Sequence, residues 1–241
     1  MGMIEDVRTT ASPIISLGGG FMLDGATTEH GGAFGLDFGE YYAMGRGGVL
    51  GDVDADVITS AFVVFAPAMV RTMWEAARAK REPAAAALSY AQACQAWGRL
   101  HFSNVQNLDE TAALLEQIAV AASPIGAPLF AGWRAISLPL DAPARVAQLL
   151  HVLRELRGGL HGVAILGAGL APIEAVMVYN PGMAPMFGWA DGAPATDATK
   201  AAHAKAELAT DELVAPAYEC LGDTGRARLV VLLNELAATS S

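Results

Sequence analysis

The stretch His151-Val-Leu-Arg-Glu-Leu-Arg-Gly-Gly-Leu-His161 concentrates charged and imidazole side chains in a chain that is otherwise mostly apolar. At 100° per residue, His151, Arg154 and Glu155 share one arc of a helix, and leucines occupy the opposite side. Two arrangements fit this pattern. Either the charged side faces water, where its ion pairs stabilise little, or a second helical layer covers it and the charges line a pocket. In the covered arrangement, a histidine beside a carboxylate and an arginine could transfer protons near neutral pH.

The same stretch contains a signal for a helix end. Gly158 and Gly159 are adjacent, and glycine is unfavourable in a helix interior. We therefore expect the helix that begins at Asp141 and Pro143 to bend or break at these glycines. His161 would then begin the next helix, close to the mouth of the same pocket.

Composition limits the class of protein. The chain of 241 residues has 53% hydrophobic and only 17% charged residues. Such a composition requires either a large apolar interior or a buried subunit interface, and a homodimer is the commonest symmetric assembly. No uninterrupted apolar run of about 18 residues occurs, so we expect no membrane-spanning helix. The segment MGMIEDVRTTASPI lacks a basic region followed by an apolar core, which predicts no signal peptide and a cytoplasmic location.

Charge and cysteine content narrow the possible partners. A formal net charge of −10 repels a phosphate backbone and the basic residues are scattered, so nucleic-acid binding is not expected. Cys94 and Cys220 lie far apart in apolar, helical surroundings and are interpreted as small core residues in a reducing compartment. The five histidines form no H-x-x-x-H pair. Neutral histidines can bind a metal or haem, so such a site stays open as an alternative, but no metal-ligating residue is predicted and no motif identifies a cofactor.

Helical periodicity over most of the chain predicts an all-α, multi-helix bundle. Two alternatives stay open: a short hairpin near 125–140 or 183–195, and a division into two lobes, 1–123 and 124–241. The tail is expected to form two amphipathic helices joined at Gly222. The predicted helices cover 54–80 with a kink at Pro67, 83–101, 107–122, 141–157 and 199–238.

Two short helices joined at Gly169 would give residues 162–179 the shape of a helix-turn-helix. The second of these helices, from Pro172 to Tyr179, contains no arginine or lysine, and Glu174 would repel phosphates. As a recognition helix it therefore lacks the side chains that read base edges.

Four segments, GGGFMLDGAT, YYAMGRGGVLGDVDADVITSAFVVFAP, LHVLRELRGGLH and LVAPAYECLGD, resemble an actinobacterial family of mostly uncharacterised proteins. Its members are described as helix-turn-helix or winged-helix related, and some accompany specialised-metabolism genes. Where other members carry a longer wing segment, this chain has residues 182–194, which weakens the expectation of DNA binding. The resemblance implies no particular reaction. It covers most of the chain, and the family pattern falls on Leu153, Arg154, Glu155, Arg157, Gly158 and His161.

Residues outside this stretch are also site candidates. Arg46 lies between glycines, where it either complements a helix dipole or meets an anionic ligand group. His30 is either a turn or surface residue or a member of the site. The aromatic and methionine residues around Phe65 are either plain core or a ligand box. We predict catalytic roles for His151, His161 and Glu155, and ligand binding by Arg154, Arg46, His30, Tyr42, Phe65, Met69 and Trp133.

Three functions are consistent with these features. The first is a small-molecule-binding helical protein, extending to a metal-independent enzyme that uses histidine, arginine and glutamate for acid–base chemistry in an apolar pocket. The second is a helix-turn-helix transcriptional regulator with weak or lost DNA binding. The third is a dimeric scaffold, which only the high apolar content supports.

Overall fold

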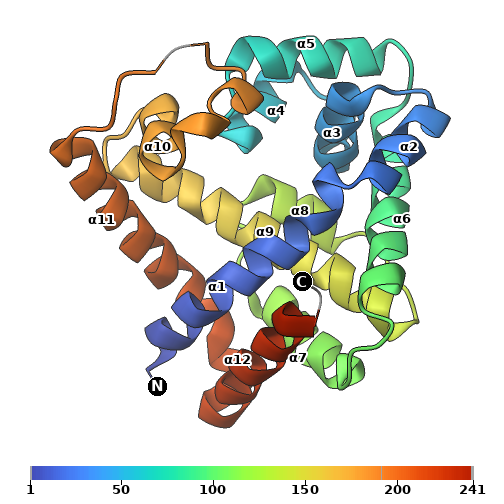
Figure 1. Ribbon diagram of the computed structural model, residues 1–241, viewed down its shortest axis with the longest axis vertical. Coiled ribbons are helices and arrows are strands. Elements are labelled where there is room, and N and C mark those ends of the chain that lie inside the picture. Colours follow the sequence, from blue (N-terminus) through green and yellow to red (C-terminus); the bar gives the residue numbers. More distant parts are fainter. Residues whose placement is uncertain (1, 191, 240–241) are drawn as a thin grey trace.

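The computed structural model describes residues 2–190 and 192–239, and this part of the chain is helical and contains no strand (Figure 1). The prediction of an all-α protein is confirmed, and the alternative hairpins are wrong. Residues 125–140 contain a short helix, and 183–195 contain 3-10 turns where they are described. In chain order the elements are α1 (Met3–Gly19), η1 (Gly20–Leu23), α2 (Gly25–Phe34), α3 (Phe38–Gly47), η2 (Gly48–Leu50), α4 (Ala55–Phe62), α5 (Pro67–Arg78), α6 (Pro83–His101), α7 (Leu108–Ala121), α8 (Pro128–Arg134), α9 (Ala142–Gly167), α10 (Pro172–Tyr179), η3 (Pro181–Met183), η4 (Pro185–Phe187), α11 (Asp197–Val214), η5 (Ala215–Leu221) and α12 (Gly222–Thr239).

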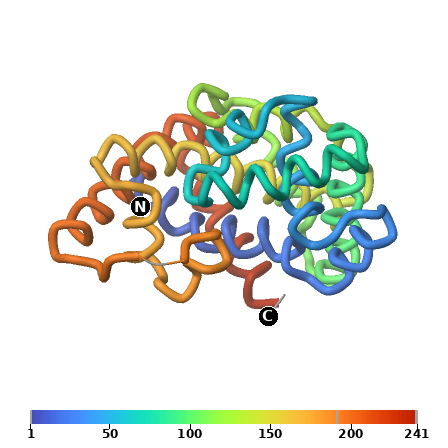
Figure 2. Tube along the Cα trace, turned by 90° about the horizontal axis from the view of Figure 1, so that it is seen from above, coloured from blue at the N-terminus to red at the C-terminus, as the bar shows by residue number. Residues whose placement is uncertain are grey.

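Helix α9 forms the centre of the molecule (Figure 1). It packs against α1, α6, α7, α8 and α11, and every side chain from Val146 to Leu156 except that of Arg154 is buried. In both views α12 (red) lies beside α1 (blue), so the end of the chain packs against its beginning (Figure 2). A helix that is buried on nearly all sides must be covered by a complete layer of neighbours.

Helix α9 continues through Gly158 and Gly159, so the predicted break at these glycines was wrong. The helix is 26 residues long, and His161 lies inside it. A Cβ atom on Gly159 would come within 2.7 Å of the Cα atom of Ala127, and one on Gly162 would come within 2.7 Å of Val63. These glycines therefore allow close packing, and tertiary contacts outweigh the low helix propensity of glycine.

The predicted helix over 54–80 is two helices, α4 and α5, separated by residues 63–66. Val63 ends α4 with a φ of 46°, and Pro67 is in the first turn of α5. Proline disfavours helical geometry in the residue before it but suits the first turn of a helix. Ala66 is accordingly extended, and its N–H donates to the carbonyl oxygen of Phe187. Pro67 thus begins a helix where we expected a kink.

One hydrophobic core includes residues of both predicted lobes, from Val7 to Leu236. Helix α9 belongs to the second predicted lobe, yet it packs against α1, α6 and α7 of the first. A division into 1–123 and 124–241 therefore does not correspond to separate cores. A smaller apolar cluster joins the end of α9 to α10 and α11.

The cysteines and the apolar helices can also be compared with the predictions. Cys94 is buried as predicted, but Cys220 is exposed and is not a core residue. No single helix in the described part is long and apolar enough to cross a membrane, although α9 and α10, which meet at a bend of 110°, meet that criterion of length and composition together.

Candidate functional site: a cavity beside helix α9

Glu155 lies at the centre of a buried charge cluster (with Arg46 and Arg154) between α3 and α9. Its side chain is 1% exposed. Arg46 donates to both carboxylate oxygens, from Nε at 2.9 Å and from Nη2 at 2.8 Å, and Arg154 donates from Nη1 at 2.8 Å. Burial alone would raise the pKa of Glu155, but the two arginines lower it to about 2. The polar face is therefore covered at this point and does not face water.

His151 lies one turn from Glu155 and is fully buried. Its ring packs edge-on against Trp133, with centroids 4.4 Å apart, and against Phe21 at 5.2 Å. Burial lowers the pKa of His151 to about 3, so the imidazole is neutral at physiological pH. Proton transfer to a ligand, as predicted for His151 and Glu155, does not fit this geometry, because both side chains are sealed beneath the surface.

A cavity of about 350 Å³ opens beside the charge cluster, between α3, α4, α9, α10 and α11. A second cavity of about 180 Å³ adjoins it on the side of η1 and α5. The walls shared by the two cavities include Tyr42, Phe65 and Arg154. Volumes of several hundred cubic ångströms are typical of small-molecule sites. The larger cavity is lined by Ile15, Tyr42, Arg46, Ala61, Phe62, Val63, Val64, Phe65, Arg154, Arg157, Gly158, His161, Gly162, Ile165, Ala175, Val176, Tyr179, Met183, Phe187, His203 and Glu207.

The structure brings several predicted site residues to these cavities and separates others from them. Two predicted ligand residues are elsewhere. His30 contacts Ser89 Oγ at 3.1 Å through Nε2, and Trp133 lies fully buried behind the cluster, where its indole N–H donates to the carbonyl oxygen of Arg46 at 3.0 Å. The predicted residues that line a cavity are Arg46, Tyr42, Phe65, Arg154 and His161 in the larger one and Met69 in the smaller one.

Three residues of the cavity with charged or imidazole side chains were not among the predicted site residues: Arg157, His203 and Glu207. Arg157 belongs to the stretch quoted above, so helical position alone could have included it. His203 and Glu207 are four residues apart on one helix, a spacing that places both side chains on one face. Their position beside α9, however, depends on how α11 packs.

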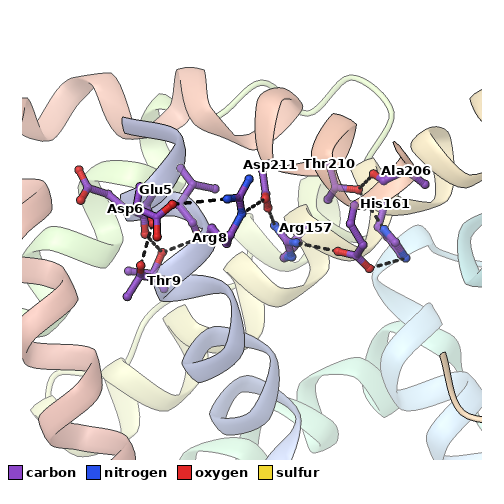
Figure 3. Close-up of polar contacts among 12 residues, drawn as sticks. Glu5, Asp6, Arg8, Thr9, Arg157, His161, Ala206, Thr210 and Asp211 are labelled. Carbon is purple, nitrogen blue, oxygen red and sulfur yellow. Dashed lines mark hydrogen bonds and ion pairs between the residues drawn. The ribbon is translucent and has the colours of Figure 1, made fainter. Parts of the chain in front are cut away.

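A polar network joins α1, α9 and α11 (Figure 3), and its members Arg157, His161 and Glu207 line the larger cavity. Arg157 donates to Asp211 at 2.8 Å and to Glu207 at 3.2 Å, and Arg8 of α1 donates to Asp211 at 3.1 Å. The carboxylate of Asp211 is buried, and Arg8 and Arg157 compensate its negative charge. His161 contacts the hydroxyl of Thr210 at 2.9 Å. The network fixes α1, α9 and α11 relative to one another at the cavity.

The sequence matches a helix-turn-helix family over residues 7–191. The chain belongs to this helix-turn-helix family. No curated protein and no solved structure matches it significantly. In this family member, α9 and α10 meet at 110° across residues 168–171, which include Gly169 in the left-handed conformation. This angle and turn length are typical of a helix-turn-helix. Helix α10 also forms a wall of the cavity, through Ala175 and Val176.

Proposed function

We propose that this protein binds one elongated, largely apolar small molecule that carries a single anionic group, in the two adjoining cavities beside α9. The observation that carries the proposal is the position of Arg154, which lines both cavities at their junction. Among the described residues its guanidinium donates only to Glu155, through Nη1, so other N–H donors remain for a ligand. An arginine at this junction suits a carboxylate or phosphate group.

The charges around the larger cavity support an anionic ligand. Arg46, Arg154 and Arg157 line it, and Glu207 is the only carboxylate among the lining residues in the described part of the chain. Glu155 neutralises Arg46, and Asp211 together with Glu207 neutralises Arg157. Arg154 also pairs with Glu155, at 2.8 Å, so it shares one carboxylate with Arg46 and has none to itself. The chain as a whole has a net charge of −10, so three arginines around one cavity are a local concentration of cationic groups.

The apolar part of the ligand would lie between aromatic and aliphatic side chains. Phe62, Phe65 and Val176 line the larger cavity, and Met69 and Met73 line the smaller one. Methionine and aromatic surfaces accommodate flexible apolar groups well. If the protein is an enzyme with acid–base chemistry, His161 is the member of the predicted catalytic set that meets the ligand. The resemblance to proteins of specialised metabolism agrees with such a ligand class.

Paired probes test this proposal. Decanoate and decan-1-ol have the same apolar chain, and only decanoate carries a charge. We expect the wild type to bind decanoate with a dissociation constant below about 100 μM. Arg154→Gln should weaken decanoate binding at least about tenfold, the usual contribution of a charge-assisted hydrogen bond, and leave decan-1-ol binding unchanged. Arg71→Gln, at an exposed arginine on α5, is the matched control. Equal decanoate affinity in Arg154→Gln and wild type would contradict the role of Arg154.

A DNA-binding regulator is the second candidate, and the α9–turn–α10 geometry favours it. The composition of α10 opposes it, because this helix contains no arginine or lysine and three of its residues line the cavity. Fluorescence anisotropy with duplex DNA at 50 and 200 mM salt would distinguish the two. Binding that weakens steeply with salt would support the regulator, since phosphate contacts release counterions.

A further inference from the structure

Two histidines and a glutamate meet at the edge of the larger cavity. His203 and Glu207 lie on the same face of α11, and His161 faces them from α9. The Oε1 atom of Glu207 lies 3.7 Å from Nε2 of His161 and 4.0 Å from Nε2 of His203. One donor atom from each of the three residues lies within 4.8 Å of the other two. All three side chains also line the cavity, so the point between them is open to a ligand.

The hydrogen bond between His161 and Thr210 determines which nitrogen of His161 faces the cluster. The Thr210 hydroxyl donates to the carbonyl oxygen of Ala206 at 2.7 Å. It must therefore accept from Nδ1–H of His161, at 2.9 Å. In the neutral imidazole, Nε2 then carries a lone pair that is directed toward the Glu207 carboxylate. Two acceptors that face each other in this way need a cation or a proton between them.

The glutamate is held in a similar way through its other oxygen. Arg157 donates to Oε2 of Glu207 at 3.2 Å, which leaves Oε1 toward the two histidines. Arg157 is itself held by the buried carboxylate of Asp211 at 2.8 Å. Figure 3 shows Arg157 beside Asp211, and Thr210 beside His161. Support of the non-coordinating atoms by outer residues is characteristic of metal sites, because it fixes the tautomer and orientation of each ligand.

We propose that His161 Nε2, His203 Nε2 and Glu207 Oε1 bind a single divalent transition-metal ion whose remaining coordination positions face the cavity. Two imidazoles and one carboxylate are the donor set of catalytic zinc sites and of non-haem iron(II) sites. Donor atoms around a tetrahedral ion lie about 3.4 Å apart, so the three side chains need to close by about 1 Å on binding. The two histidines belong to different helices and are far apart in the sequence. The sequence therefore contains no spacing typical of a metal site, and we predicted no metal ligands.

Metal titration of the whole chain tests the proposal. After chelator treatment, Zn²⁺ binding is measured by calorimetry, and Co²⁺ is added as a spectroscopic probe. We expect one ion per chain, a visible Co²⁺ band of a low-symmetry site, and a higher melting temperature with Zn²⁺. His203→Ala and Glu207→Gln should each weaken Zn²⁺ binding at least about tenfold, because each removes one of three ligands. His101→Ala and Glu212→Gln, at positions outside the cluster, should bind Zn²⁺ as the wild type does.

Thermal unfolding without metal shows whether each variant is folded. Glu207 is half-exposed and His203 is more buried, so Glu207→Gln is the variant less prone to unfold. The proposal is overturned by an absence of Zn²⁺ and Co²⁺ binding tighter than about 0.1 mM. Unchanged Zn²⁺ affinity in either ligand variant would overturn it as well. The experiment contains no organic ligand, so its result is independent of whether the cavity binds decanoate.

Discussion

At the scale of single residues, the ion pair between Arg46 and Glu155 is the most tightly constrained feature of the cluster. Arg46 makes two hydrogen bonds to the carboxylate, and both side chains are less than 10% exposed. Burial disfavours the charged form of the arginine, but the carboxylate raises the pKa of Arg46 above its usual range. Two buried charges of this kind depend on each other, since neither can be neutralised at physiological pH.

Removal of one partner of this ion pair should therefore lower the free energy of unfolding. We expect Glu155→Gln to lower the free energy of unfolding by about 3 kcal/mol, because the guanidinium of Arg46 stays buried without its counter-charge. Urea denaturation at pH 7 measures this change. Glu75→Gln, at an exposed ion pair on α5, should change the stability by less than about 0.5 kcal/mol. Similar values for the two variants would contradict the burial of the cluster.

His151 provides a pH-dependent prediction. The unfolded chain binds a proton at this residue below about pH 6.5, whereas burial prevents the folded protein from doing so until the pH falls to about 3. The free energy of unfolding therefore decreases as the pH is lowered from 6.5 toward 3. Between pH 7 and pH 5 the loss from this residue is about 2 kcal/mol. His151→Leu should be less sensitive to pH by this amount in urea titrations, and an unchanged pH dependence would show that His151 is accessible to protons.

At the scale of elements, the continuity of α9 depends on which neighbour each glycine faces. A Cβ atom on Gly158 would meet no neighbouring atom within 4 Å, whereas one on Gly159 would meet the backbone of Ala127. Gly158→Ala should stabilise the protein by about 0.5–1 kcal/mol through higher helix propensity. Gly159→Ala should destabilise it by about 1–2 kcal/mol through overpacking. Thermal or urea unfolding measures both, and opposite signs to these would show that the helix is not packed in this way.

Periodicity and capping signals predict most helices but not where they are interrupted. The helices at 83–101 and 107–122 and the tail helices were predictable because their apolar faces and first-turn residues are local signals. The break at residues 63–66 and the continuity of α9 were not, because both depend on contacts with distant residues. Phe187 accepts the hydrogen bond that fixes Ala66, and Ala127 is the surface to which Gly159 fits.

At the scale of the whole molecule, the packing of distant segments creates the candidate site. Arg154 and His161 were predictable because they lie in one conspicuous stretch, and Arg46 was predictable as an arginine among glycines. His203 and Glu207 reach the same cavity only because α11 packs against α9. His30 and Trp133 were predicted as ligand residues from their type alone, and packing places them outside the cavities. The homodimer expected from the apolar composition remains a prediction for light scattering to test.

Blocking the space beside α9 tests most directly whether this space is a binding site. Val64 lines the larger cavity, and Val57 is an exposed valine on α4 outside its lining. In calorimetric titrations with decanoate, we expect the wild type and Val57→Phe to bind one molecule per chain with equal affinity. Val64→Phe should bind it at least about tenfold more weakly, because the added ring occupies the site. Equal decanoate affinity in Val64→Phe, or no binding by the wild type, would contradict the account.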